Sequence, residues 1–153
     1  MQQRIYFDTS VIGGFYDVEF MEATQLLFEK DRSGDFIVAF SEVTEQELFD
    51  APERVRNLIN ELPAKNIERI PLTQEATLLA DKYIGENVVG ITSKTDCLHI
   101  ALATINKVDI LASWNFKHIV NITRIRGYNG INIMLGYSPL EIRTPKEIIR
   151  YED

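Results

Sequence analysis

Three polar residues follow or open apolar segments, at places where an α/β protein can use them in chemistry. Asp8 comes directly after the apolar run 5–7, and two residues separate Asn115 from the apolar run 110–112. Asp96 opens an expected apolar helix, where a carboxylate also favours the positive end of the helix dipole. Because the functional crevice of an open parallel sheet lies at the carboxyl ends of its strands, we expect these side chains at one sheet edge.

A fourth candidate, Glu47, is indicated by the helical periodicity that follows Ser41. On a helix running to about residue 50, Glu47 lies within the apolar arc bounded by Val43 and Leu48, whereas Glu45 lies on the opposite side. A carboxylate on an apolar face is costly without a compensating partner. We therefore expect Glu47 to have a charged or hydrogen-bonding partner, and Glu45 to be a solvated surface charge.

Asp8, Glu47 and Asp96 would repel one another at one sheet edge unless a cation lay among them. Ligation by oxygen alone selects Mg²⁺ or Mn²⁺. Carboxylate-bound ions of this kind activate water and stabilise displacement at a phosphodiester. Taken singly, Asp8 has the ordinary alternative of ending a strand, and Asp96 that of a first-turn helix acid. The prediction therefore rests on their joint placement.

Short, wholly apolar runs alternate with helical periodicity, which is typical of a parallel sheet covered by helices on both faces. The sequence predicts a three-layer α/β fold in a single domain, residues 1–153, with central strands at 4–7, 36–39 and 110–113. Weaker strands are expected at 67–72 and 140–143, and helices at 20–32, 41–50, 73–84, 96–105 and 115–127. The helix over 96–105 is apolar around nearly its whole circumference and should be central.

Composition limits the class of protein. With 45% hydrophobic and 25% charged residues, the 153-residue chain matches an average soluble domain and excludes disordered, collagen-like and coiled-coil proteins. No apolar run approaches the roughly 20 residues that a membrane span needs. The lone Cys97 cannot form an internal disulfide, which favours a reducing compartment. We therefore expect a cytoplasmic protein without a membrane segment.

The net charge of −7 is unevenly distributed along the chain. The first 113 residues carry 10 Lys/Arg and 19 Asp/Glu, whereas residues 114–150 carry six Lys/Arg and two Asp/Glu, and 110–140 contains no acid. An acidic protein does not coat nucleic acid, but a local basic face can still hold a phosphate chain. We expect Lys117, Arg124 and Arg126 to form such a basic rim beside the carboxylates.

Four motifs, in this order, resemble those of the PIN-domain ribonucleases and, within them, of the VapC-like toxins of toxin–antitoxin pairs. They are Tyr-Phe-Asp-Thr-Ser at 6–10, Ser-x-x-Thr-x-x-Glu-Leu at 41–48, Thr-Asp-x-x-His-Ile-Ala at 95–101 and Leu-Ala-Ser-Trp-Asn-Phe-Lys-His at 111–118. The match covers most of the chain. It implies a PIN-like form of the α/β fold.

The resemblance also implies roles for individual residues. Asp8, Glu47 and Asp96 match the family's metal-binding acids, which are its catalytic residues. Thr9 or Ser10 matches its supporting hydroxyl.

One position departs from the family's pattern. Where PIN domains often have a fourth acid after the last core strand, this chain has Asn115. Its amide oxygen could still bind the metal or orient a water, but it brings no charge. The departure puts a second metal site in doubt and leaves open a catalytically degenerate PIN-fold module that binds RNA or a protein partner.

By resemblance, we expect an endoribonuclease that uses Mg²⁺ or Mn²⁺ to cleave RNA phosphodiesters with an activated water, as the toxin of a toxin–antitoxin pair. Its partners would be RNA and an antitoxin, whose Arg or Lys would replace the metal's charge at the acids. The antitoxin's remaining grip would come from an amphipathic helix near residues 12–28. Five apolar side chains cluster there: Ile12, Phe15, Tyr16, Phe20 and Leu27. The alternative is that these residues pack in the core or in a homodimer interface.

Residues beside the expected site have simpler interpretations. His99 lies three residues after Asp96, and a hydrogen-bonded core histidine is favoured over a ligand or proton shuttle. Cys97 lacks a neighbouring base and is interpreted as a small buried residue. His118 could meet an RNA phosphate or have an ordinary surface role. For Trp114, core packing is favoured over base stacking.

Rival phosphate- or metal-binding folds are disfavoured by single residues. A haloacid-dehalogenase-type phosphotransferase would need an Asp where Ser10 stands, and a metal-dependent adhesion site would need a Ser where Ile12 stands. In a receiver domain, a glutamate that points inward at position 47 would have no role.

Overall fold

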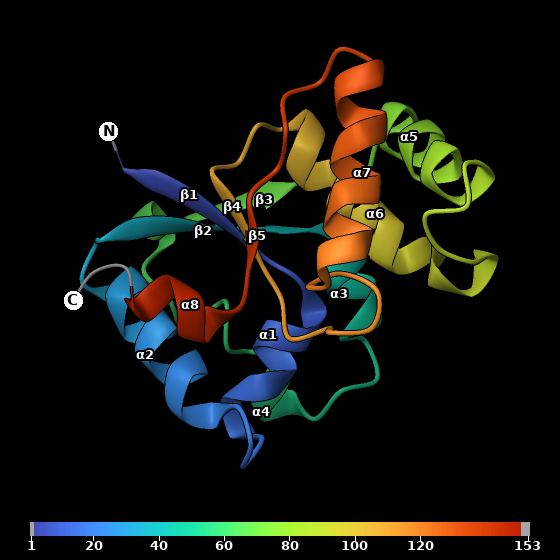
Figure 1. The fold of residues 1–153 in the computed structure, drawn as a ribbon. Coiled ribbons are helices and arrows are strands. Elements are labelled where there is room, and N and C mark those ends of the chain that lie inside the picture. The colour runs from blue at the N-terminus through green and yellow to red at the C-terminus, as the bar shows by residue number, and fades with distance from the viewer. Residues whose placement is uncertain (1, 151–153) are drawn as a thin grey trace.

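The computed structural model describes residues 2–150, except for the side chain of residue 92. Within them lies a five-stranded parallel sheet of order β3-β2-β1-β4-β5 (Figure 1). The strands are β1 (Gln3–Phe7), β2 (Phe36–Ser41), β3 (Ile67–Ile70), β4 (Ile110–Ala112) and β5 (Ile142–Arg143). All the predicted strands are confirmed, the two weaker ones being shorter than expected. The extreme ends of the predicted domain, residue 1 and residues 151–153, lie outside the described residues.

Helices cover both faces of the sheet, which gives the three-layer α/β fold that the apolar strands predict (Figure 1). On one face lie α2 (Met21–Arg32) and α8 (Pro145–Arg150), and on the other α5 (Gln74–Gly85), α6 (Lys94–Ile105) and α7 (Ile122–Met134). The remaining helical pieces are α1 (Thr9–Gly13), α3 (Glu42–Glu47), α4 (Glu53–Arg56) and three 3₁₀ turns at Gly14–Tyr16, Ala64–Asn66 and Ile91–Ser93.

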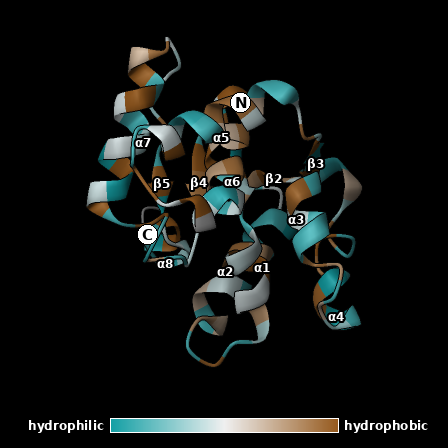
Figure 2. Ribbon diagram, turned by 90° about the vertical axis from the view of Figure 1, so that its right-hand side faces the viewer, coloured by the Kyte–Doolittle hydropathy of each residue, from teal (hydrophilic) through white to brown (hydrophobic). Residues whose placement is uncertain are grey.

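The sheet separates two hydrophobic cores, because side chains alternate between its faces along each strand. In β1, Tyr6 packs in the core beneath α5, α6 and α7, whereas Ile5 and Phe7 pack in the core beneath α1 and α2. Helix α6 is buried over most of its length, as its all-round apolar pattern predicts. In Figure 2 hydrophobic residues gather on the strands and on the parts of the helices that face them.

The segment after β4 departs from the predicted helix over 115–127. The backbone carbonyl of Asn115 accepts two N–H groups of the following turn, and α7 begins only at Ile122. The Asn121 side chain caps this helix by accepting two first-turn N–H groups. An asparagine favours a cap over a helix interior because its side chain competes for backbone hydrogen bonds, so the helix starts later than predicted.

Two short helices were also missed. Helix α1 begins directly after Asp8, where no helix was expected, and α8 begins at Pro145, a residue suited to the first helical position.

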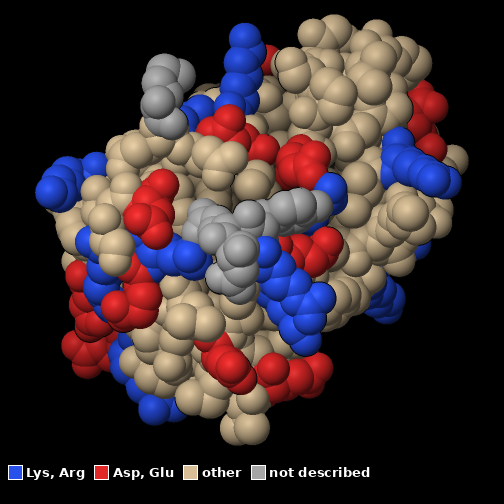
Figure 3. All heavy atoms as spheres, turned by 60° about the vertical axis from the view of Figure 1, so that its left-hand side comes forward, with Lys and Arg blue, Asp and Glu red and all other residues tan. Residues whose placement is uncertain are grey.

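Acidic and basic side chains are interspersed on the side of the molecule seen in Figure 3, where neither sign dominates. In the described part of the chain, no helix is long and apolar enough to cross a bilayer.

Candidate active site

Asp8 lies at the carboxyl end of β1 and caps α1. Its Oδ1 accepts hydrogen bonds from Ser10 Oγ (2.6 Å) and from the backbone N–H of Val11 (3.1 Å), and its Oδ2 accepts one from Ser113 Oγ (2.5 Å). The residue is 3% exposed, and this burial raises the pKa of its carboxyl, which the charge of His99 and the three donors oppose. Burial and the hydrogen bonds therefore act in opposite directions on the pKa of this carboxyl, and burial has the larger effect.

Ser113 is a site residue to which the sequence assigned no role. It follows β4, whose pairing with β1 places the ends of the two strands side by side. Its Oγ also accepts the backbone N–H of Asn115 at 2.9 Å. The sequence did contain a signal for it: Ser113 directly follows the apolar run 110–112, just as Asp8 directly follows the apolar run 5–7.

Glu47 is the last residue of α3, a short helix capped by Ser41. Its Oε1 accepts hydrogen bonds from Thr9 Oγ1 (2.5 Å) and His99 Nε2 (2.6 Å). Burial alone would raise the pKa of Glu47, but the hydrogen bond and charge of His99, together with the Thr9 hydroxyl, lower it. The expectation of a partner for this carboxylate is confirmed, and Glu45 is an exposed charge paired with Arg69 at 2.8 Å.

His99 is the buried histidine of the site, 2% exposed, and it is hydrogen-bonded on both ring nitrogens. Nδ1 lies 2.7 Å from the hydroxyl of Tyr6, which in turn lies 2.6 Å from Ser41 Oγ. The expected core histidine is confirmed, and its partners place it directly behind Glu47. The buried, unpaired Cys97 also fits its interpretation.

Asp96 lies in the first turn of α6 and is half-buried. Burial raises the pKa of its carboxyl, and the nearby charge of Glu47 adds to this rise. The charges of His118 and His99 and a hydrogen bond from Asn115 act in the opposite direction. Glu47 and Asp96 therefore lie within electrostatic reach of each other, and Asp8, Glu47 and Asp96 all lie within reach of His99.

Asn115 follows β4 and its side chain lies beside Asp96. Its Oδ1 accepts the backbone N–H of His118 at 3.0 Å, and its hydrogen bond to Asp96 lowers the pKa of that carboxyl. The amide nitrogen thus faces Asp96, while the oxygen that the sequence assigned to a metal has a backbone partner. Metal binding by Asn115 stays a prediction, which would use the second lone pair of this oxygen.

The carboxylates match a divalent-cation site in kind. Carboxylate and amide oxygens are the ligands that Mg²⁺ and Mn²⁺ prefer. Among residues 2–150 as described, however, no three His, Cys, Asp or Glu side chains stand together closely enough to hold an ion. Hydroxyl and N–H donors occupy both oxygens of Asp8 and one oxygen of Glu47. Oε2 of Glu47 and the carboxylate of Asp96 are the most available ligands.

Two residues of the predicted basic rim are free to meet a phosphate chain. Lys117 and Arg126 are exposed, and neither makes an ion pair or hydrogen bond within the described part of the chain. Arg124 differs, because its guanidinium donates to the backbone carbonyl of Val88 and its side chain is half-buried. This contact gives Arg124 a role in joining α7 to the segment before α6.

The apolar surface predicted over 12–28 is partly core. Ile12 and Leu27 are fully buried, so they are not available to a partner. An apolar groove remains between α2 and α8, where the Phe20 and Trp114 rings stack at 4.4 Å. Trp114 reaches the site through its backbone N–H, which donates to Ser10 Oγ at 2.9 Å. The groove is lined by Glu19, Phe20, Glu22, Ala23, Leu26, Trp114, Lys146 and Ile149.

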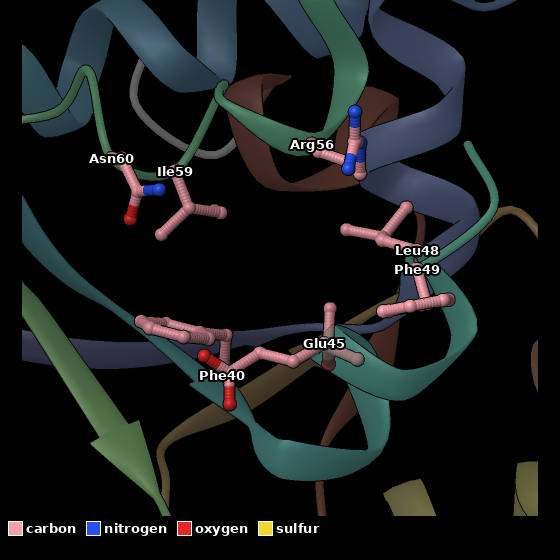
Figure 4. Close-up of a pocket in the computed structure, with 8 residues that line it drawn as sticks. Phe40, Glu45, Leu48, Phe49, Arg56, Ile59 and Asn60 are labelled. Carbon is pink, nitrogen blue, oxygen red and sulfur yellow. The ribbon is translucent and has the colours of Figure 1, made fainter. Parts of the chain in front are cut away.

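A second pocket, of about 160 Å³, lies between the α3 region and the segment 56–60 (Figure 4). Figure 4 shows Arg56 and Asn60 across the pocket from Phe40 and Glu45. Lys117, Arg124 and Arg126 do not line this pocket, so it does not continue the basic rim.

Solved structures of VapBC and FitAcB proteins share this fold. VapBC2 from Rickettsia felis, bound to a promoter DNA fragment, aligns with a TM-score of 0.59 and 12% identity over 93% of this chain and 98% of that chain. DNA-bound VapBC from Salmonella typhimurium aligns with a TM-score of 0.58 and 15% identity over 95% and 99% of the two chains. FitAcB from Neisseria gonorrhoeae aligns with a TM-score of 0.54 and 15% identity over 93% and 98%.

No family model matches the sequence, and no curated relative is found. The likeness is therefore one of fold, and the three-layer α/β domain is PIN-like.

Proposed function

We propose that this protein is a PIN-type endoribonuclease that depends on Mg²⁺ or Mn²⁺ and acts in the cytoplasm as the toxin of a toxin–antitoxin pair. The observation that carries the proposal is that Asp8, Glu47 and Asp96, from three separate elements, each lie within electrostatic reach of His99. The fold shared with the VapBC and FitAB structures supports the same function.

The three acids, with Asn115, would hold the divalent cation. When bound, such an ion polarises a phosphodiester and lowers the pKa of a water enough for attack on phosphorus. The chain's own residues prepare the ligands: Ser10 and Ser113 fix the two oxygens of Asp8, and hydrogen bonds fix one oxygen of Glu47. Fixing the ligands in advance reduces the reorganisation that catalysis requires.

The RNA chain would be held by Lys117 and Arg126, which are exposed and unpaired within residues 2–150 as described. Phosphate contacts of this kind position a strand without reading its sequence. Arg124 would contribute to the same field, although its guanidinium already binds the Val88 carbonyl.

Cleavage of a single-stranded RNA in Mn²⁺ buffer tests the proposal. We expect cleavage by the wild-type protein that EDTA abolishes and that Asp96→Asn reduces by at least about 100-fold, because a ligating carboxylate is lost. Cleavage that persists in EDTA, or that is unchanged in the variant, would contradict the assignment.

A binding-only module is the second candidate function. It is favoured by Asn115, which replaces a carboxylate and whose oxygen accepts a backbone N–H. RNA binding without cleavage, in metal-replete buffer and with intact folding, would establish this alternative.

The proposed antitoxin would bind the groove between α2 and α8. An apolar floor edged by Glu19, Glu22 and Lys146 suits an amphipathic helix that brings both apolar and charged side chains. A cation from the same partner would compete for the carboxylates.

Co-expression with the product of the neighbouring open reading frame tests this partner. Leu26→Arg, at a groove residue that is 47% exposed, should prevent co-purification. Leu78→Arg, at a residue of α5 that is 62% exposed, is the matched control and should not. A homodimer that buries the groove would instead show a change in oligomeric state for Leu26→Arg alone.

A further inference from the structure

A buried hydrogen-bond chain connects Glu47 to the centre of the protein. Ser41 Oγ lies 2.6 Å from Tyr6 Oη, Tyr6 Oη lies 2.7 Å from His99 Nδ1, and His99 Nε2 lies 2.6 Å from Glu47 Oε1. Ser41 and Tyr6 are 0% exposed and His99 is 2% exposed. The chain joins β2, β1, α6 and α3, and only its Glu47 end reaches solvent.

The chemistry of the partners places the protons in this chain. The ionised carboxylate of Glu47 can only accept, so His99 Nε2 carries the proton that they share. Burial raises the pKa of the Tyr6 hydroxyl well above its usual range, so this group keeps its proton. Tyr6 can therefore donate to Nδ1 of a neutral ring or accept from a charged one. In both states Nε2–H points to Glu47.

Glu47 depends on such contacts because α3 alone does not hold its carboxylate. The residue ends a six-residue helix, and its side chain is 34% exposed. A long side chain in this position keeps its rotamer freedom unless tertiary contacts remove it. His99 Nε2 and Thr9 Oγ1 both bind Oε1. Oε2 is left without a donor in the described part of the chain.

We propose that His99, supported by Tyr6, is a positioning residue that holds Oε1 of Glu47 so that Oε2 is presented to the divalent cation. This inference rests on the proposed function and adds to it the means by which the most exposed of the three acids is fixed. His99 is too buried to touch RNA, so it acts through Glu47. Hydrogen-bond partners of metal ligands typically change metal affinity by about 10–100-fold.

Two substitutions of His99 separate positioning from packing. Asn places its amide near the position of Nδ1, beside Tyr6, whereas Gln places its amide near the position of Nε2, beside Glu47. We expect His99→Asn to weaken Mn²⁺ binding, measured by electron paramagnetic resonance without RNA, by about 10-fold or more. His99→Gln should retain affinity within about threefold of wild type, since its amide can still donate to Glu47. Melting temperatures of both variants report any general loss of structure.

Tyr6→Phe removes only the hydroxyl behind His99. We expect a smaller loss of Mn²⁺ affinity, of about threefold, because the ring stays in place but loses one of its two fixed contacts. Tyr83→Phe is the matched control: its hydroxyl is also buried and donates to Asn132 Oδ1 at 2.5 Å, in the core and not in the site. This control should leave Mn²⁺ affinity unchanged.

The loss of Mn²⁺ affinity caused by His99→Asn must also depend on Glu47. In a Glu47→Gln background, His99→Asn should cause no further loss of Mn²⁺ affinity, because the positioned carboxylate is already gone. Equal losses for the Asn and Gln variants, or a full additional loss in the Glu47→Gln background, would overturn the inference while the proposed nuclease still stood. A wild-type protein that neither binds Mn²⁺ nor cleaves RNA would overturn both.

A readout without metal completes the test. Nitrogen-15 shifts of the His99 ring in wild-type protein should show a protonated Nε2. An unprotonated Nε2 would contradict the positioning role whatever the activity.

Discussion

Asp8 and Asp31 are two buried aspartates near opposite ends of the sheet, and the protein treats them differently. Asp8 is 3% exposed and accepts three hydrogen bonds at the carboxyl ends of β1 and β4. Asp31 is 0% exposed, near the end of α2, and its Oδ2 accepts only the Val38 N–H at 3.2 Å. Oδ1 of Asp31 has no partner among the described residues. Burial raises the pKa of both carboxyls, that of Asp31 to about 6.

The difference lies in how many groups oppose the cost of burying each carboxylate. At Asp8, two hydroxyls, one backbone N–H and the charge of His99 oppose the cost of burial. At Asp31, one N–H and the charge of Arg32 are the opposing groups, and at both aspartates burial outweighs the opposing groups. Hydrogen-bond donors that are already in place around a carboxylate suit catalysis, whereas an undercompensated buried charge reduces stability.

The largest expected effect separates the two aspartates by activity. Asp8→Asn should lower RNA cleavage by at least about 100-fold, because a metal-binding charge is removed. Its unfolding free energy should be equal to or above that of wild type at neutral pH, since a neutral amide costs less to bury. Asp31→Asn should cleave at the wild-type rate. Equal activities for the two variants, in the same Mn²⁺ assay, would remove the functional side of the comparison.

The second prediction concerns the pH dependence of stability that Asp31 causes. The folded-state pKa of Asp31, about 6, lies above its ordinary value of 3.8, so the folded protein binds this proton more tightly than the unfolded chain. The contribution to stability is therefore present below pH 4 and is lost as the pH rises through 6. Relative to wild type, Asp31→Asn should gain about 2 kcal/mol of unfolding free energy between pH 4 and pH 7.5.

Urea titrations at the two pH values measure this difference. Because the comparison is between pH values, any constant cost of burying the new amide cancels. If the difference in unfolding free energy between wild type and Asp31→Asn does not change with pH, Asp31 has the same protonation in the folded protein and in the unfolded chain.

The same comparison shows what the sequence could predict. Asp8 contacts Ser10 and Val11, two and three residues away, and a polar residue after an apolar strand is a local signal. Its third donor, Ser113, is 105 residues away, and only the β1–β4 pairing brings it close. The sequence therefore indicated the acid and part of its support.

Glu47 repeats this pattern. Its inward direction followed from helical spacing, since a helix has a fixed period. Its partner His99 is 52 residues away on α6, and no local pattern specifies the packing of α3 against α6. The late start of α7 was missed for another reason, because the Asn121 cap competes with continued helix only in the context of the preceding turn. Periodicity specified the strands, whereas tertiary contacts completed the site.

The third prediction extends the comparison to nucleic acid. Reversing the charge of Lys117 and Arg126 together should weaken RNA binding by about 10-fold at low salt and reduce the salt dependence by about 0.7 per lost phosphate contact. Lys65→Glu, an exposed change on the turn before β3, is the control and should alter neither quantity. The cleavage sequence should not change in either protein. An unaltered salt dependence of RNA binding in the double variant would show that the basic rim does not face the RNA.

The smallest expected effect concerns Asn115, the one position where the site departs from the acidic pattern. Asn115→Asp adds a carboxylate beside Asp96, in place of an amide whose hydrogen bond lowers the pKa of Asp96. Without a cation the two acids repel, so the pKa of Asp96 should rise further and the metal-free protein should lose some stability above that pKa. With a cation the added charge is compensated, and Mn²⁺ affinity should increase about threefold to tenfold.

Asn121→Asp is the matched control for this substitution. Aspartate caps a helix as well as asparagine does, and residue 121 is not one of the proposed metal ligands. Calorimetric titration with Mn²⁺ compares the three proteins. If Asn115→Asp binds Mn²⁺ no more tightly than the control, this side chain does not reach the ion, and the cation site consists of the three acids alone.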